Sequence, residues 1–200
     1  MKLYLAGPEV FLANARVVLD AKAALARSYG FTPLKPGDIY VEHGPTPHQF
    51  GLKINAVDEQ MMNEADGIIA NLTPYRGLSA DVGTSYELGY MCALGKKVAA
   101  YTNVAEDFFS RCKSFYDGQI TMDETGRWRG PDGCALENTE MIDNLMLHGG
   151  IARRGGHVAI HQASKDSLYS DLTGFEACLR FLAGQRDAEP SMLPGAQPVV

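Results

Sequence analysis

The sequence lacks an excess of positive charge. Its 200 residues include 18 Lys and Arg against 24 Asp and Glu, so the formal net charge is −6. A basic stripe that could neutralise the phosphates of a nucleic acid polymer is therefore not expected. Nucleosides and other small neutral metabolites remain compatible with this charge, because they carry no phosphate backbone.

Cysteine is scarce, and neither cysteine nor histidine shows the spacing of a metal site. The four cysteines are scattered without a C-x-x-C motif, and Cys92 and Cys178 lie within helical patterns. Small buried apolar side chains explain such positions better than a disulfide framework does. Long apolar runs are missing too, and the N-terminus lacks the basic head and apolar stretch of a signal peptide. We expect a protein of the reducing cytoplasm with no metal site and no membrane partner.

The sequence does contain a regular alternation of short apolar runs and helical patterns. No Walker sequence accompanies it, and no G-x-G-x-x-G follows the first run. The alternation predicts a doubly wound α/β fold, flavodoxin-like or Rossmann-like, with a parallel sheet flanked by helices. The predicted strands and helices alternate in chain order, beginning with a strand: 2–6, 12–28, 31–34, 49–65, 68–71, 82–94 and 98–101.

The second half of the chain is more elaborate. From 103 to 138 the sequence loses periodicity, and its turn residues predict a hairpin that contains Trp128. Beyond this hairpin we predict a short helix over 140–147, a strand over 157–160 and a last helix over 175–182.

These patterns predict one domain without internal repeats. A chain of this length is long enough for one proper core, and a second full domain would be crowded. We assign residues 1–184 to the domain and predict a flexible, partly Pro-rich tail over 185–200.

Two carboxylates and two glycines gather in the segment 81–90, at the start of the predicted helix 82–94. Open α/β sheets bind small ligands at this place, beyond the carboxyl end of a strand. Glu87 has small or apolar neighbours three and four positions away, so it belongs to the packed face of the helix. A catalytic role and a first-turn glutamate that complements the helix dipole explain it equally well. For Asp81 alone an N-cap is the better explanation, and Gly83 is only a weak phosphate signal.

Two further polar residues stand among apolar neighbours. Asp58 shares the predicted helix 49–65 with a stripe that includes Ile54, Met61 and Ala65, and a carboxylate on such a stripe needs a buried partner or a task. We favour a functional role for Asp58 over a place at the edge of the stripe. Tyr4 lies in the first strand, where a core tyrosine is the simpler interpretation.

Several segments match a known family in a fixed order. They are Tyr4-Leu5-Ala6-Gly7-Pro8-Glu9-Val10-Phe11, Asp58 with Ala65-Asp66-Gly67-Ile68-Ile69-Ala70-Asn71-Leu72, Tyr75-Arg76-Gly77, Asp81-Val82-Gly83-Thr84-Ser85-Tyr86-Glu87-Leu88-Gly89 and Asp143-Asn144-Leu145-Met146-Leu147. Together they resemble the nucleoside 2-deoxyribosyltransferases over residues 1 to about 183. The segments 118–135 and 150–165 are longer than in that family.

The resemblance implies an enzyme of nucleotide salvage that transfers a pentosyl group. Glu87 is similar to the nucleophile, which attacks C1′ of a 2′-deoxynucleoside, expels the base and holds the sugar as an ester. Tyr4 resembles the tyrosine that positions this glutamate, and Asp58 resembles the aspartate that exchanges a proton with the base. A second base then attacks from the face that the first one left, so the configuration is retained. Neither a metal nor an organic cofactor is implied.

The resemblance also implies a substrate-binding set. Asp81 and Asn144 match positions that hold the sugar's 5′-hydroxyl, with Asn144 reaching in from a neighbouring subunit, so a homo-oligomer is expected. On residues alone Asn144 is equally well a local cap. Gly7 and Phe11 resemble walls of the base pocket, and Gly83 lies within the substrate-binding motif. The partners would be a 2′-deoxyribonucleoside donor and a free purine or pyrimidine base, and the loop 35–47 would be a lid.

Two other functions share this pattern. A 2′-deoxynucleoside 5′-monophosphate N-glycosidase would carry a hydroxyl residue in place of Asp81 and a Ser/Arg/Gly-rich loop after the first strand. Here that loop is 7–11, which has no arginine and contains the acidic Glu9, and the Asp81 carboxylate would repel a phosphate, so we expect unphosphorylated substrates. A non-catalytic nucleoside-sensing domain on the same fold would not need Glu87 as a nucleophile.

Overall fold

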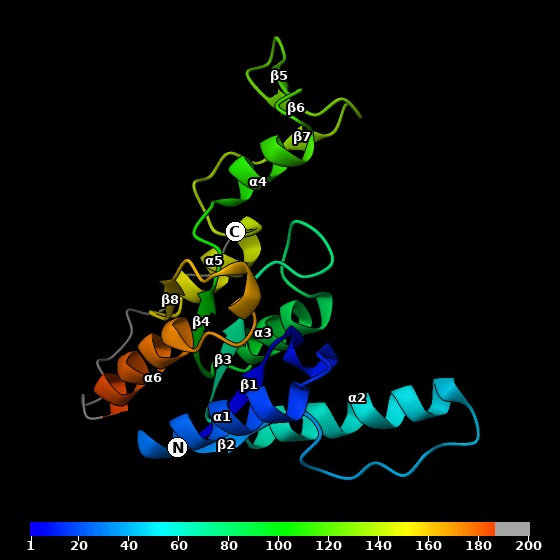
Figure 1. Cartoon of the computed structure of the whole chain (residues 1–200), viewed down its shortest axis with the longest axis vertical. Helices are drawn as coiled ribbons and strands as arrows, with labels where there is room; N and C mark the ends of the chain where they lie inside the picture. Colours follow the sequence, from blue (N-terminus) through cyan, green and yellow to red (C-terminus); the bar gives the residue numbers. More distant parts are fainter. Residues whose placement is uncertain (187–200) are drawn as a thin grey trace, which may run out of the picture.

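A five-stranded sheet with helices on both faces forms the centre of the computed structural model, which describes residues 1–186 (Figure 1). The strands are all parallel and run in the order β2-β1-β3-β4-β8. The elements of the sheet and its helices are β1 (Lys2–Ala6), η1 (Pro8–Phe11), α1 (Ala15–Ser28), β2 (Thr32–Leu34), α2 (Pro47–Glu64), β3 (Gly67–Asn71), α3 (Val82–Ala93), β4 (Lys97–Thr102), α5 (Leu145–Ala152), β8 (His157–Ile160), η2 (Lys165–Ser167) and α6 (Thr173–Arg186).

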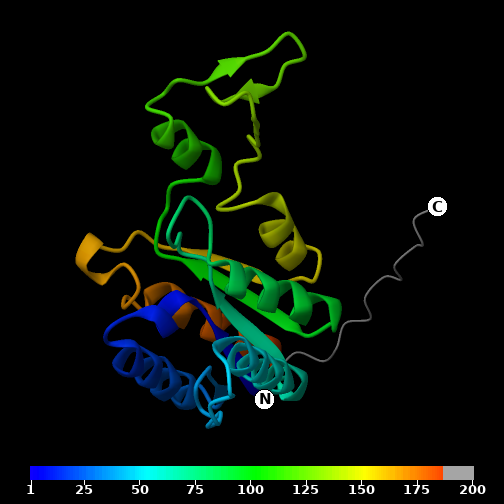
Figure 2. The same ribbon diagram turned by 90° about the vertical axis from the view of Figure 1, so that its right-hand side faces the viewer.

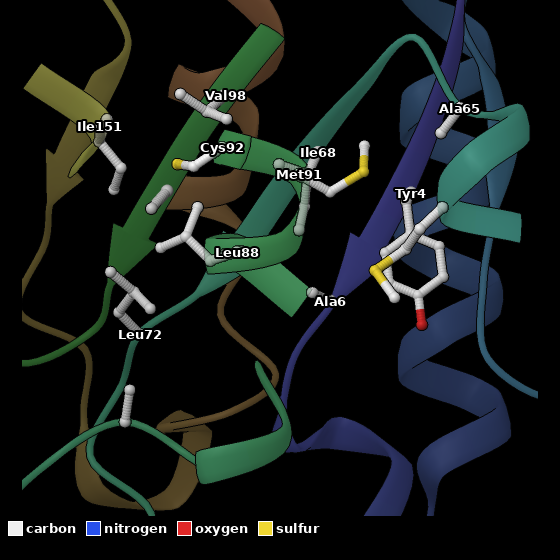
Figure 3. Close-up of a cluster of buried hydrophobic side chains, with 14 of the residues drawn as sticks. Tyr4, Ala6, Ala65, Ile68, Leu72, Leu88, Met91, Cys92, Val98 and Ile151 are labelled. Carbon is white, nitrogen blue, oxygen red and sulfur yellow. The ribbon is translucent and has the colours of Figure 1, made fainter. Parts of the chain in front are cut away.

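Different helices cover the two faces of the sheet. Because successive side chains of a strand point to opposite faces, Tyr4 packs into the cluster of α2, α3 and α5, and Leu3 and Leu5 pack against α1 and α6. Both faces are buried, which explains why the central strands read as continuous apolar runs. Figure 3 shows the first cluster, with the Tyr4 hydroxyl pointing away from the labelled aliphatic side chains. Tyr4 therefore faces the layer that contains α3.

A second unit projects from the central sheet, and we call it the arm (Figures 1 and 2). The arm consists of α4 and three short antiparallel strands: α4 (Phe108–Phe115), β5 (Thr121–Met122), β6 (Trp128–Arg129) and β7 (Ala135–Leu136). The Trp128 ring lies 5.5 Å from the ring of Phe109 on α4, and the Asp123 carboxylate holds Arg129 at 2.8 Å. The ring contact joins the hairpin to α4, and the Asp123–Arg129 contact links the two sides of the hairpin.

The structure confirms the predicted doubly wound fold. All seven elements predicted over 2–101 are present, with ends shifted by up to three residues, and so are the hairpin around Trp128, the strand over 157–160 and the last helix. The largest shift is at α1, where the predicted helix 12–28 begins only at Ala15, because the chain makes the short helix η1 first. Of the predicted tail, residues 187–200 lie outside the described residues.

Two sequence predictions are wrong in detail, and one helix was not predicted. The short helix is not 140–147 but α5, since Asn144 caps its first turn and Ile142 is buried before it. Helix α4 was not predicted, because eight residues give too short a pattern to recognise. Ile54 is 39% exposed instead of buried on the core stripe, because the first half of α2 extends beyond the sheet (Figure 1).

The cysteine predictions hold. Cys92 and Cys178 are buried and free, and within residues 1–186 every cysteine is a free thiol. In the same part of the chain no helix has the length and apolar character needed to cross a membrane. No group of three metal-ligating side chains occurs there either.

Candidate active site

A hydrogen bond between Tyr4 and Glu87 forms the centre of the candidate site. The Tyr4 hydroxyl donates to Glu87 Oε1 at 2.7 Å, across 83 positions of the sequence. Tyr4 is fully buried on β1, and Glu87 lies in the second turn of α3. The first-turn dipole explanation of Glu87 is therefore wrong, because α3 has no acidic residue in its first turn. The interpretation of Tyr4 as a core residue is right for its ring and incomplete for its hydroxyl.

The surroundings of Glu87 change its acidity. Burial raises the pKa of Glu87 from its ordinary value of 4.5 to about 7, against the hydrogen bond from Tyr4, which lowers it. The nearby carboxylates of Asp58 and Asp81 contribute to this rise, and the Lys22 ammonium opposes it. Burial, with the charge of Glu87, also raises the pKa of Tyr4 far above its usual range, so the phenol stays protonated. The pair is thus a neutral donor and a carboxylate that titrates near neutral pH.

Asp58 lies at an apolar hollow beside this pair. The hollow has a volume of about 300 Å³ and is lined by Gly37, Ile39, Tyr40, Val41, Phe50, Ile54, Val57 and Asp58. Burial raises the pKa of Asp58, and its charge in turn acts on both Tyr4 and Glu87. The loop predicted as a lid supplies half of the lining, so it lies where it can cover a flat apolar ligand. Asp58 is the only carboxylate in this lining.

Asp81 is the N-cap of α3, as its residue type predicts. Its Oδ2 atom accepts hydrogen bonds from the Thr84 backbone N–H at 3.0 Å and from the Thr84 hydroxyl at 3.3 Å. A Cβ at Gly83 would lie 3.0 Å from the same oxygen, so the glycine leaves room for the cap. The cap leaves Asp81 only partly buried, on the same helix end as Glu87.

Phe11 and Gly7 lie in the segment that follows β1. Phe11 is 55% exposed, and its ring stacks on Tyr75 at 5.4 Å, with the Arg76 guanidinium 5.3 Å from the Phe11 centroid. The two aromatic rings and the cation form an open ledge. Gly7 is buried, and a Cβ there would come within 1.9 Å of Glu9 Oε2. Only glycine fits at that position without displacing the buried carboxylate.

Glu9 does not face the site, which corrects the sequence argument about phosphate. Its carboxylate is fully buried, and Oε1 binds Lys22 Nζ at 2.7 Å, the Tyr101 hydroxyl at 2.9 Å and Asn71 Nδ2 at 3.1 Å. Lys22 itself is fully buried beside aromatic rings. The negative charge of Glu9 is neutralised inside the protein. Repulsion of a phosphate therefore depends on Asp81.

Asn144 is a predicted site residue that the structure does not join to the Tyr4–Glu87 pair. Its side-chain oxygen caps α5 by accepting from the Met146 N–H at 3.0 Å, and its Nδ2 atom donates to Glu137 Oε2 at 3.2 Å. Within residues 1–186 its side chain makes no hydrogen bond to Tyr4, Asp58, Asp81 or Glu87. The local-cap interpretation is confirmed, and a role in a neighbouring subunit stays a prediction.

The sequence analysis did not identify three buried polar residues that support the site, which are Lys22, Arg111 and Asp143. Lys22 carried a signal, because it falls within the apolar stripe of α1 beside Leu19 and Ala23. Asp143 also carried one, since it stands next to Asn144 in a matching segment. Arg111 carried none, because the helix on which it lies was not predicted.

The chain can be compared with known proteins on this basis. The family model described as "Nucleoside 2-deoxyribosyltransferase" matches residues 3–146. A protein of Schizosaccharomyces pombe, itself described as uncharacterized, is 30% identical over 188 residues, which cover 88% of this chain and 89% of that protein.

Solved structures share the architecture. The 2-desoxiribosyltransferase from Leishmania mexicana superposes with a TM-score of 0.62 at 26% identity, over 92% of this chain and 97% of that one. A conserved protein from Enterococcus faecalis V583 superposes with a TM-score of 0.52 at 19% identity, over 85% of this chain and 96% of that one, and is similar in fold. The family match covers Tyr4, Asp58, Asp81, Glu87 and Asn144.

Proposed function

Because the chain belongs to the nucleoside 2-deoxyribosyltransferase family, we propose that it exchanges the base of a 2′-deoxyribonucleoside through a covalent ester on Glu87. The observation that carries this proposal is the partly buried Tyr4–Glu87 hydrogen bond, with the charge of Asp58 acting on both residues. A carboxylate that is shielded from water and held by a neutral donor is suited to attack a sugar carbon. A capping or packing role would not require a carboxylate whose burial works against its charge.

In the proposed first step a Glu87 oxygen bonds to C1′ while the bond from C1′ to the base breaks. The bonding electrons leave with the base nitrogen, and Asp58 supplies the proton that makes the departing base neutral. The anionic carboxylate stabilises the oxocarbenium-like transition state and then captures it. Attack by a second base, with its proton going to Asp58, restores both carboxyl groups. Two inversions at C1′ give a product of the same configuration.

The remaining predicted residues bind the substrate in this proposal. The base enters the hollow at Asp58, with Phe11 at its border, and the 5′-hydroxyl bonds to Asp81. Asn144 would complete this contact in a neighbouring subunit, because its own chain holds it at the start of α5. We therefore propose a homo-oligomer as the active form; an active monomer in sizing and assay would contradict it.

The function is tested by incubating the protein with deoxyinosine or thymidine and each free base in turn. We expect a new 2′-deoxynucleoside on chromatography, and no faster release of base from dCMP or dGMP than from the nucleosides. Faster release from the monophosphates would favour the N-glycosidase instead. Binding of nucleosides without any cleavage would favour the sensing domain.

The pH dependence of exchange follows from the pKa of Glu87. Because the first step needs Glu87 ionised and Asp58 protonated, kcat/KM should follow a bell-shaped pH profile, and the midpoint of one limb should lie at the Glu87 pKa of about 7. Replacing Tyr4 with phenylalanine removes a hydrogen bond that favours the charged form, so the midpoint should move to higher pH. Tyr90→Phe, which removes a surface hydrogen bond to Asn63, is the matched control and should leave the midpoint in place. An unshifted profile for Tyr4→Phe would contradict the assignment.

Asp58→Asn should slow exchange by about 10²–10³-fold, because the departing base loses its proton donor. The loss should be much smaller with 7-methyl-2′-deoxyguanosine, whose cationic base leaves as a neutral molecule without protonation. Comparing kcat for the two kinds of donor measures this difference. An equal loss for both donors would mean that Asp58 acts in binding instead of proton transfer.

A further inference from the structure

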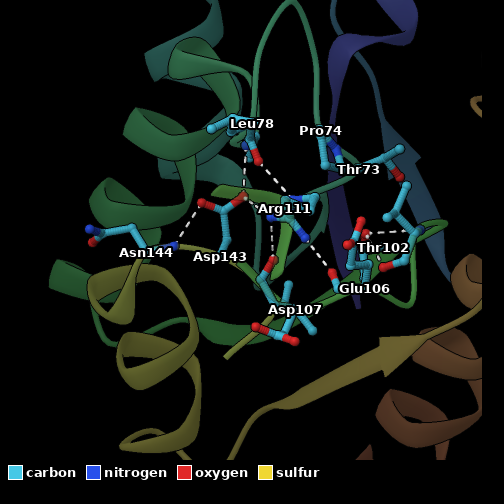
Figure 4. A network of polar contacts seen from close by, with 12 residues as sticks. Thr73, Pro74, Leu78, Thr102, Glu106, Asp107, Arg111, Asp143 and Asn144 are labelled. Carbon is cyan, nitrogen blue, oxygen red and sulfur yellow. Dashed lines mark hydrogen bonds and ion pairs between the residues drawn. The ribbon is translucent and has the colours of Figure 1, made fainter. Parts of the chain in front are cut away.

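One buried carboxylate ties together the two segments that carry Asp81 and Asn144 (Figure 4). Asp143 is fully buried, and its two oxygens accept hydrogen bonds from two backbone N–H groups. Oδ2 accepts from Ala80 at 2.8 Å, directly before Asp81, and Oδ1 accepts from Asn144 at 2.7 Å. These segments lie 63 positions apart in the sequence. Asp143 thereby fixes the backbone at both proposed contacts to the 5′-hydroxyl.

Arg111 holds this carboxylate and the surrounding loops in place. Its side chain is 6% exposed, and its Nη2 atom lies 3.6 Å from Asp143 Oδ2. The same guanidinium donates to three carbonyl oxygens: Nε to Leu78 at 2.9 Å, Nη2 to Ile142 at 2.6 Å and Nη1 to Glu106. Leu78 and Ile142 belong to the same two segments that Asp143 joins. Arg111 lies on α4, so this network also fastens the arm to the site.

We propose that Arg111 and Asp143 are a positioning pair that sets selectivity for the substrate's 5′-hydroxyl. The proposal rests on the proposed function, in which Asp81 and Asn144 bind that hydroxyl. Neither Arg111 nor Asp143 needs to touch the substrate. A hydrogen bond requires its partners within a few tenths of an ångström, so a shift of either segment weakens it. Asp143 fixes the backbone at Asp81 and at Asn144 in every chain, and this is so whether Asn144 contacts the substrate of its own subunit or of a neighbouring one.

The chemistry of the pair explains why a charged group is needed. Two backbone N–H groups converge on one side chain, and only a carboxylate accepts both with separate oxygens. In Asp143→Asn one oxygen becomes an NH2 group, which would face an N–H donor and push one segment away. Arg111→Lys keeps the positive charge, but its N–H donors all lie on one nitrogen and cannot reach the three carbonyls that the Nε, Nη1 and Nη2 atoms of Arg111 reach.

The test compares the binding of 2′-deoxyinosine and 2′,5′-dideoxyinosine, which differ only in the 5′-hydroxyl. Dissociation constants are measured by calorimetry in protein that also carries Glu87→Ala, so that neither ligand is turned over. Asp143→Asn should reduce the preference for the hydroxylated ligand by about tenfold. Arg111→Lys should act in the same direction, and it decides the outcome if Asp143→Asn does not fold. Asp123→Asn, the same change at the arm's pair with Arg129, should leave the preference unaltered.

Each outcome separates positioning from a merely structural role. Equal weakening of both ligands, or an unchanged preference in the folded variants, would overturn the proposal. Failure of either nucleoside to bind the Glu87→Ala protein would overturn it as well. If the preference falls as expected but the wild-type protein exchanges no base, the positioning pair stands and the transferase proposal fails. If the wild-type protein exchanges bases normally but the variants keep the wild-type preference, the transferase proposal stands and the positioning pair fails.

Discussion

Replacing Glu87 with alanine should abolish base exchange, lowering kcat by at least about 10⁴-fold. Without this carboxylate, the proposed ester on Glu87 that carries the sugar between two bases cannot form. Tyr4 cannot replace it, because burial keeps the phenol protonated at neutral pH. Chromatography of the nucleosides after incubation with donor and acceptor base measures the loss.

Two controls distinguish the loss of the nucleophile from a loss of folding. Glu59→Gln removes a carboxylate that binds only the surface hydroxyl of Tyr86, and it should retain exchange. Glu87→Gln should be at least as stable as the wild type at pH 8. The reason is that a carboxyl group whose pKa is raised from 4.5 to about 7 loses folding stability as the pH rises through that range. Full exchange by a folded Glu87→Ala protein would leave the sensing domain or another nucleophile as the explanation.

A covalent adduct provides the direct evidence for the same step. A 2′-fluoro-2′-deoxynucleoside should release its base and leave its sugar on the peptide that contains Glu87, because the fluorine slows the second displacement. Mass spectrometry of the digested protein locates the added mass. Attachment to another residue would refute the assignment of the nucleophile, while the wild-type exchange assay would still test the reaction.

The sequence predicted the layered fold well because each layer has a local signature. Strands buried on both faces appear as short continuous apolar runs, and the helices between them show helical periodicity. The family resemblance then identified Tyr4 and Glu87 as partners, although 83 positions separate them. Residue types alone left each of them with an equally good or better structural explanation. Pairing is a property of the tertiary structure, and a single sequence does not show it.

The partners of the supporting residues were not predictable from the sequence, for a physical reason. A buried ion pair or a buried carboxylate is stable only with its partners, and those partners come from distant segments. Glu9 illustrates this point: its sequence position suggested a charge facing the ligand, but the structure turns it inward to Lys22. The start of helix α5 is a different case, because the cap that Asn144 forms with the Met146 N–H is local.

Replacing Lys22 with methionine should destabilise the protein by about 3–5 kcal/mol. The Glu9 carboxylate would then be left fully buried without a cation, held by the neutral donors Asn71 and Tyr101 alone. For a domain of this size the loss corresponds to a fall in melting temperature of about 6–20 °C. Calorimetry or denaturant unfolding measures it. Lys165→Met is the control at an exposed lysine and should change stability by less than about 0.5 kcal/mol.

The double variant distinguishes the ion pair from simple packing. Removing both charges with Glu9→Gln and Lys22→Met leaves no unpaired ion, so it should recover most of the stability that Lys22→Met alone loses. If the double variant is as unstable as the sum of the two single variants, the Lys22 side chain contributes through its packing beside Tyr101 and Phe175. The charge pair would then not be what holds the loop after β1 against the sheet.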